Sequence, residues 1–158
     1  MRVAALLLVA CQAPTPVAAP SGKLVLSGLR VKIAVPPGTR VEEGGGPDAV
    51  TLGQGDCVVM LWREDPAAPL RWEDAIAERR RVTSGPGRVR EMQREERLSD
   101  GGFRLEWTEE RESKDVLVHA VQHRIKLGAD WFGCGRKVRT PAAQACVRAA
   151  CESLEPLL

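Results

Sequence analysis

The sequence predicts an α+β domain in which an antiparallel sheet of about six strands is flanked by two main helices. Apolar residues alternate with polar ones from residue 29 to 35, which is the period of a half-buried strand. Two later segments, 72–82 and 141–155, combine apolar residues at helical spacing with residues typical of helix ends. Glycine-containing turns separate most of the other apolar segments and favour hairpins between them.

The strands follow one another along the chain with short connections. The alternating segment 29–35 ends at Pro36-Pro37-Gly38, and residues 49–52 and 57–62 should form a hairpin. An antiparallel four-strand meander is expected from residues 88–97, 103–110, 116–127 and 131–138. Residues 116–126 are apolar on both faces at their start and on one face farther along, so this strand should lie inside the sheet.

The two helices should cover different parts of the sheet. Residues 72–82 have an apolar stripe of Trp72, Ala75 and Ile76, with acidic residues in the first turn that suit the helix dipole. Thr140 is a candidate N-cap before a helix expected to run to about Glu155. We expect this closing helix to pack against the apolar side of strand 131–138, and the first helix to lie on the opposite face or across an edge.

The chain begins with the features of an export signal. Met1-Arg2 supplies a positive charge, and residues 3–10 are an apolar run that ends before Cys11. Leu8, Val9, Ala10 and Cys11 resemble the bacterial lipobox, in which the signal peptide (residues 1–10) is removed and the cysteine is lipidated. The alternative is a first core strand, but the run leads directly into a segment rich in proline and alanine.

The resemblance to a lipobox implies a protein that is anchored to a membrane through acyl chains. Eight helical residues cover about 12 Å, too short to span a bilayer. Residues 11–22 would be the tether, and residues 23–158 have the length of a single globular domain. Gln12 follows the cysteine where the enteric sorting rule would require Asp for inner-membrane retention, which points to the periplasmic face of the outer membrane.

Charge and cysteine content restrict the partners and the compartment. The net charge of +2 falls to +1 when Arg2 is removed with the signal, and acids and bases interleave, so we expect no nucleic-acid partner. The even number of cysteines that remain beside Cys11 favours two disulfides in an oxidising compartment. A zinc site is the alternative, but the chain has no Cys-x-x-Cys pair.

Helix geometry restricts how the four cysteines can pair. Cys146 and Cys151 lie on the predicted closing helix, where a separation of five residues points their side chains about 140° apart. They should therefore not bond to each other. This leaves Cys134 joined to one of them and Cys57 to the other.

The order of elements, together with three short segments, is similar to the PsbP-like fold. Gly28–Gly38 resembles its opening strand with a Pro-Gly exit, Trp72–Ala75 its first helix, and Cys151–Leu154 its closing helix. The family includes a photosystem extrinsic subunit and bacterial lipoproteins of the DcrB type. The resemblance implies an α/β/α sandwich that serves as a binding or assembly module and is not an enzyme.

Residues capable of chemistry are few and poorly spaced. His119 and His123 lie on one predicted strand, about 13 Å apart, so they cannot readily share a metal. Gly44–Gly46 is not followed by the Lys-Ser/Thr of a phosphate loop. Four acidic residues lack the spacing of a calcium loop: Glu109, Glu110, Glu112 and Asp115. We expect no catalytic residue, no metal and no cofactor.

The tryptophans are the better candidates for recognition, because the chain has few other aromatic residues. Trp62, Trp72, Trp107 and Trp131 should mostly be core, and an exposed one would mark a binding surface. A groove lined by Trp and Arg would favour a non-enzymatic, envelope-anchored module that binds a protein partner. A pocket that gathers His123 with carboxylates would favour a metal-binding protein or a hydrolase, and a small disulfide-bonded inhibitor is a further alternative.

Overall fold

A computed structural model of the protein describes residues 22–44, 46–111 and 116–158. The expected signal peptide, the lipidation site Cys11 and all of the expected tether except Gly22 lie outside these residues. The described chain is an α+β domain with ten strands and two helices, and its strand pairings are antiparallel. No helix within it has the length and apolar character needed to cross a membrane.

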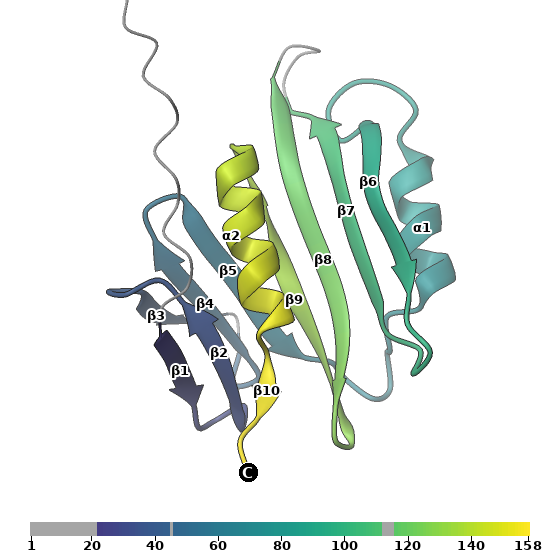
Figure 1. The fold of residues 1–158 in the computed structure, drawn as a ribbon. Coiled ribbons are helices and arrows are strands. Elements are labelled where there is room, and N and C mark those ends of the chain that lie inside the picture. The colour runs from purple at the N-terminus through teal and green to yellow at the C-terminus, as the bar shows by residue number, and fades with distance from the viewer. Residues whose placement is uncertain (1–21, 45, 112–115) are drawn as a thin grey trace, which may run out of the picture.

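The larger of two sheets has seven strands in the order β3-β4-β5-β9-β8-β7-β6 (Figure 1). Its strands are β3 (Arg40–Glu43), β4 (Ala49–Gln54), β5 (Cys57–Arg63), β6 (Val89–Arg97), β7 (Phe103–Glu110), β8 (Leu117–Leu127) and β9 (Asp130–Val138). The predicted meander is confirmed, since β6, β7, β8 and β9 are neighbours in chain order. β8 lies between β7 and β9, inside the sheet as expected.

A second sheet of three strands corrects the prediction of about six strands in one sheet. It contains β1 (Gly22–Leu26), β2 (Val31–Val35) and β10 (Glu155–Pro156), in the order β1-β2-β10. Gly22 therefore belongs to the domain and not to the tether. The sequence did not indicate β1, β3 or β10, because short edge strands with few buried side chains have no clear apolar alternation. β4 also runs on to Gln54, within the expected turn.

The helices α1 (Trp72–Arg81) and α2 (Pro141–Glu152) lie on opposite faces of the large sheet (Figure 1). Thr140 caps α2 as predicted, because its Oγ1 accepts a hydrogen bond from the backbone N–H of Ala143 at 3.1 Å. α2 ends at Glu152, before the expected Glu155. Ser153 Oγ donates to the carbonyl of Ala150 at 2.6 Å, and the chain then pairs with β2.

Each face of the large sheet has its own apolar core. On one face, α2 and the small sheet pack with the inward side chains of β4, β5, β8 and β9, including Phe132, Cys134 and Val138. On the other, α1 packs against Phe103, Leu105 and Trp107 of β7 and Ala120 of β8. The contact predicted between strand 131–138 and the closing helix is therefore present.

Two disulfides fasten α2 to the centre of the large sheet. Cys57 of β5 is bonded to Cys146, and Cys134 of β9 is bonded to Cys151. The pattern agrees with the prediction that the two helical cysteines bond elsewhere and not to each other. Helix geometry left open which of the two helical cysteines bonds to Cys134. In the structure it is Cys151, the one nearer the end of α2.

Candidate functional site

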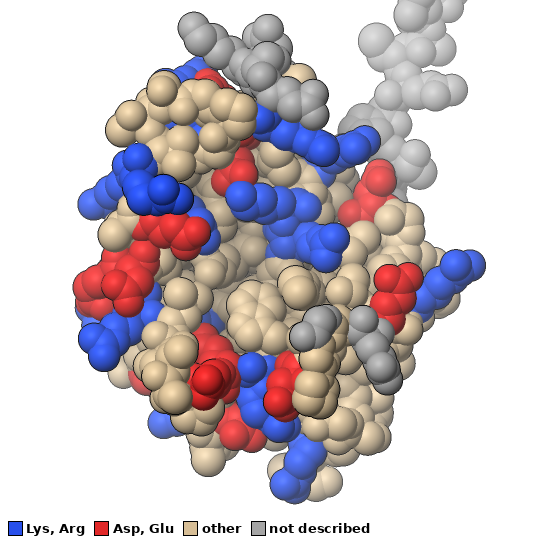
Figure 2. Space-filling view, turned by 180° about the vertical axis from the view of Figure 1, so that it is seen from behind, with Lys and Arg blue, Asp and Glu red and all other residues tan. Residues whose placement is uncertain are grey.

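The face of the sheet opposite α2 is only partly covered by a helix. The core beneath α1 takes residues from β6, β7 and β8, and none from β4, β5 or β9. We call the α1-side surface of β4, β5 and β9 the open face. Along β5 it presents Val58, Met60 and Trp62, which are partly exposed, while the intervening side chains are buried toward α2. Figure 2 shows uncharged residues in a hollow at the middle of this side, with Lys and Arg gathered above it.

Glycine forms the floor of the open face on β9. Gly133 lies opposite Trp62 in the ladder, and a Cβ at this position would be only 2.0 Å from Cζ2 of the indole. At Gly135 a Cβ would be 2.0 Å from the carbonyl oxygen of Val121. Neither position can carry a side chain in this arrangement. The indole of Trp62 consequently rests against backbone, which is the close approach that glycine within a strand permits.

One end of the open face is held by a buried arginine. Nε of Arg124 donates to both carboxylate oxygens of Glu64, at 2.9 and 3.0 Å, and Nη1 donates to the carbonyl of Gly101 at 3.2 Å. The guanidinium lies 3.7 Å from the centroid of the Trp131 ring. These contacts join β8 and β9 to the β5–α1 loop and the β6–β7 turn, so this end of the sheet is rigidly held.

The wall nearest α1 is basic. Arg79 of α1 lies 4.2 Å from the centroid of the Trp107 ring, and its Nη2 donates to Oε1 of Gln122 at 2.6 Å. Lys137 of β9 pairs with the buried carboxylate of Glu109 at 2.6 Å. Both cations are thus fixed by partners on the sheet.

A pocket of about 500 Å³ opens beside Trp62. Its other walls are formed by residues 46–49 and 63–66, which include Asp48 and Asp65. Nη1 of Arg63 donates a hydrogen bond to Oδ1 of Asp48 at 3.1 Å. The pocket therefore extends the open face toward a mixed acidic and basic rim.

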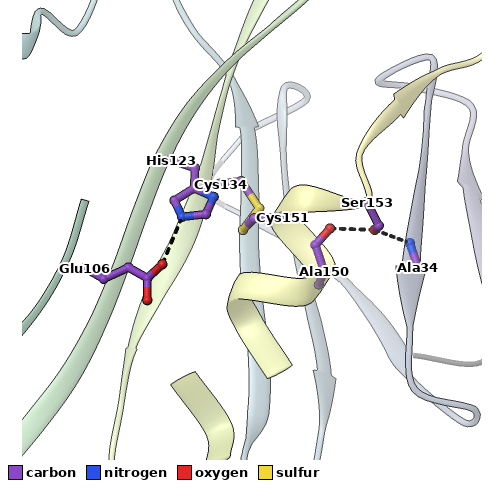
Figure 3. The surroundings of a disulfide bond; sticks show 7 residues. All are labelled: Ala34, Glu106, His123, Cys134, Ala150, Cys151 and Ser153. Atoms are coloured by element: carbon purple, nitrogen blue, oxygen red, sulfur yellow. Dashed lines mark hydrogen bonds and ion pairs between the residues drawn. A yellow bond between two sulfur atoms is a disulfide. The ribbon is translucent and has the colours of Figure 1, made fainter. Parts of the chain in front are cut away.

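His123 is fully buried on the α2 side of β8, away from the open face. Its Nε2 faces Oε1 of Glu106 (Figure 3), and the two atoms are 3.8 Å apart. This exceeds hydrogen-bond distance, and neither ring nitrogen has a hydrogen-bond partner. The imidazole lies beside the disulfide of Cys134 and Cys151. His119 lies four residues earlier on the same extended strand, as predicted, and burial lowers its pKa.

Glu106 is buried among basic side chains. Burial by itself would raise its pKa, but the contacts with His123, Arg148 and Arg94 hold the pKa at about 2. Nε of Arg148 on α2 donates to Oε2 of Glu106 at 2.7 Å, and Nη1 of Arg94 on β6 donates to Oε1 at 3.3 Å. The carboxylate therefore ties α2 to β6 and β7. Because solvent does not reach Glu106 or His123, the pair offers no accessible acid–base site.

The four acidic residues without the spacing of a calcium loop do not form one group in the structure. Glu112 and Asp115 lie outside the described residues. Glu110 accepts from Arg88 at 2.6 Å and from Arg90 at 2.9 Å, contacts that lower its pKa, and Glu109 is held by Lys137. Across residues 22–44, 46–111 and 116–158, no group of His, Cys, Asp and Glu is arranged to hold a metal ion.

Sequence reasoning identified only part of the open face. Of the four candidate tryptophans, Trp107 is buried and the others are partly exposed. Trp62 and Trp131 lie on the open face, whereas Trp72 packs with Phe103 in the core beneath α1. Val58, Met60 and Gly133 were missed. The signal that points to them is Gly133-Cys134-Gly135, since two glycines flanking a buried residue leave one side of the strand without side chains, so that a neighbouring side chain can lie against its backbone.

Comparison with protein-family models and with curated proteins finds no match to this chain.

Proposed function

We propose that the protein is a lipoprotein of the bacterial cell envelope whose domain binds another protein and catalyses no reaction. In this proposal Cys11 carries the lipid and residues 12–21 connect it to β1. Gln12 makes the periplasmic face of the outer membrane the expected location. The two disulfides support an oxidising compartment, because such bonds persist outside the reducing cytosol.

The observation that carries the binding role is the open face. Val58, Met60 and Trp62 form a partly exposed apolar ridge on β5 beside a strand whose glycines leave no side chains there. Apolar and aromatic residues bordered by arginine are typical of the energetically important part of protein interfaces.

The fixed partners around the open face support the same role. Arg124, Glu64 and Trp131 hold one end of the sheet, and two disulfides fasten its other face to α2. A surface that is rigid before binding loses less conformational entropy when a partner docks. The burial of His123 and Glu106 supports a function without catalysis, because the pair that invited an enzymatic interpretation is closed to substrates.

We also propose that the domain is of the PsbP-like type. Two helices on opposite faces of an antiparallel sheet support the α/β/α arrangement of that fold. The three-stranded sheet, which shares its face with α2, would be an addition to the core arrangement. The resemblance supports the assignment as a binding or assembly module.

Site-specific photocrosslinking in intact cells tests the binding role. A photoreactive amino acid at Val58 or Met60 should give an ultraviolet-dependent adduct with one protein of defined mass. The matched control is Leu117, another apolar side chain, which is 39% exposed and lies outside the open face. Adducts of the same mass and yield from Leu117, or none from either β5 position, would count against the open face as the docking site.

A further inference from the structure

A groove of about 670 Å³ lies between the β1–β2 hairpin and the β3–β4 hairpin. β1 is an edge strand of the small sheet and β3 is an edge strand of the large sheet. The groove is therefore the seam where two sheets end side by side (Figure 1). Its volume lies within the range of sites that hold small apolar ligands.

Every described residue that lines this groove is uncharged, although 28% of the residues in the chain are charged. Its side chains are aliphatic, supplied by Val25, Leu26, Leu29, Val41, Ala49 and Val50, and the other described lining residues are Ser, Gly or Pro. The pocket beside Trp62 differs, because charged residues line it. A hydrocarbon has no hydrogen bonds of its own to lose on entering the groove, whereas a charged group would be desolvated without a charged partner among these side chains.

The side chains at the sides of the groove are exposed to solvent, and those at its floor are buried. Val25 and Val41 are 49% and 48% exposed, but Leu26 and Leu29 are buried. An aliphatic chain lying between the two valines would remove both from water, which is favourable in proportion to the apolar area covered. A polar group at the end of that chain would remain outside, in solvent.

The chain itself supplies a hydrocarbon within reach. β1 begins at Gly22, and Val25 lies three residues farther along the strand, a distance of about 10 Å. Cys11 precedes Gly22 by eleven residues, which span at most about 40 Å when extended. A lipid on Cys11 is therefore tethered close enough to enter the groove, at the high effective concentration that a short linker provides.

We propose that one acyl chain of the Cys11 anchor occupies this groove when the protein is outside a bilayer. The inference rests on the proposed lipidation of Cys11 and adds a place for the lipid on the folded domain. Shielding the acyl chain in this way keeps it from water and from other copies of the protein. It would matter most while the lipoprotein passes between membranes.

Photocrosslinking from the lipid tests this proposal. Cells expressing the full chain are supplied with a diazirine analogue of palmitate, and the lipidated protein is purified, freed of detergent and irradiated. We expect intramolecular adducts that join the Cys11 peptide to residues 25–29 or 41–50. Label on Cys11 with adducts only elsewhere overturns the groove as the site. Absence of label from Cys11 overturns the anchor itself, and with it the occupant of the groove.

Charge placed at the sides of the groove provides the second part of the test. Val41→Glu and Val25→Glu alter half-exposed positions, so the fold should be retained, and circular dichroism checks that it is. Each variant should lower the yield of groove adducts at least tenfold and cause the detergent-free protein to associate in sedimentation. The control, Leu117→Glu, should behave like the unaltered protein. Adduct yields from Val41→Glu equal to those of the unaltered protein overturn the proposal.

Discussion

The indole of Trp62 rests against the backbone of Gly133 on the neighbouring strand, with Cζ2 only 2.0 Å from where a Cβ would stand. The open face therefore depends on the absence of one methyl group. The residues next to Trp62 in the sequence do not reveal its contact with Gly133, because the two residues come together only when β5 pairs with β9.

Gly133→Ala should displace the indole of Trp62 and destabilise the domain by about 1–3 kcal/mol, the usual cost of overpacking. Urea denaturation measures the free energy of unfolding, and tryptophan fluorescence reports the environment of the indole. Gly53→Ala is the matched control on β4, where a Cβ would meet Val58 Cγ2 at an ordinary 3.8 Å. Equal stability of the two variants would contradict the packing described here.

Glu106→Gln should destabilise the domain by about 2–3 kcal/mol, because it removes the buried carboxylate that His123, Arg148 and Arg94 share. The value lies below the usual cost of breaking a buried pair, since the side chain of Arg148 is 39% exposed and keeps part of its hydration. Glu96→Gln is the control, because Glu96 also pairs with Arg94 but is 41% exposed. Urea denaturation of the three proteins in parallel should show a clear loss only for Glu106→Gln.

Stability should fall in acid partly because of Glu106. Its pKa is about 2 in the folded protein against an ordinary value of 4.5, so the stabilisation is complete above pH 4.5. It is lost progressively as the pH falls from 4.5 toward 2, where the folded carboxylate takes up its proton. The free energy of unfolding of Glu106→Gln should therefore vary less with pH across this window. Parallel curves for the variant and the unaltered protein would be the contrary result.

The two disulfides should contribute unequally to stability. Cys57–Cys146 joins residues 89 apart in sequence, and Cys134–Cys151 joins residues 17 apart. Because a longer loop loses more freedom in the unfolded chain, replacing the first pair with alanine should cost about 1.5 kcal/mol more than replacing the second. Denaturation of the two double variants measures the difference. Mass spectrometry of a non-reduced digest should recover both pairs, and four free thiols would refute them.

Cys11→Ser should abolish palmitate labelling and release the protein from membranes, because the acyl chains on Cys11 are its proposed anchor. Metabolic labelling followed by fractionation measures both effects. Gln12→Ala, which leaves the cysteine in place, should keep its label. An unchanged membrane fraction for Cys11→Ser would contradict the lipoprotein assignment.

The sequence by itself determined those elements whose signals are local. The alternation in β2, the helical spacing and acidic first turn of α1, and the Thr140 cap of α2 each arise within a few residues. Such signals depend on the period of a strand or a helix, which any single segment displays. Glycine-containing turns in the same way indicated the meander from β6 to β9.

Only the tertiary structure decided where short strands form and where α2 ends. β3 has one apolar residue in Arg40–Glu43 and is a strand because β4 pairs with it. α2 ends at Glu152 because Ser153 accepts a hydrogen bond from Ala34 at 2.7 Å and the chain after it joins β2. In both cases the decisive partner lies far away in sequence, so no local pattern carries the information.

The same distinction applies to the candidate sites. Helix geometry excluded a bond between Cys146 and Cys151, but the choice between the two remaining pairings required the position of α2 over β5 and β9. Trp62 could be chosen from the sequence as a candidate for recognition. Its partial exposure could not, because it depends on α1 packing over β6 to β8 and not over β5. Burial is a property of how elements pack, and packing joins residues that the sequence keeps apart.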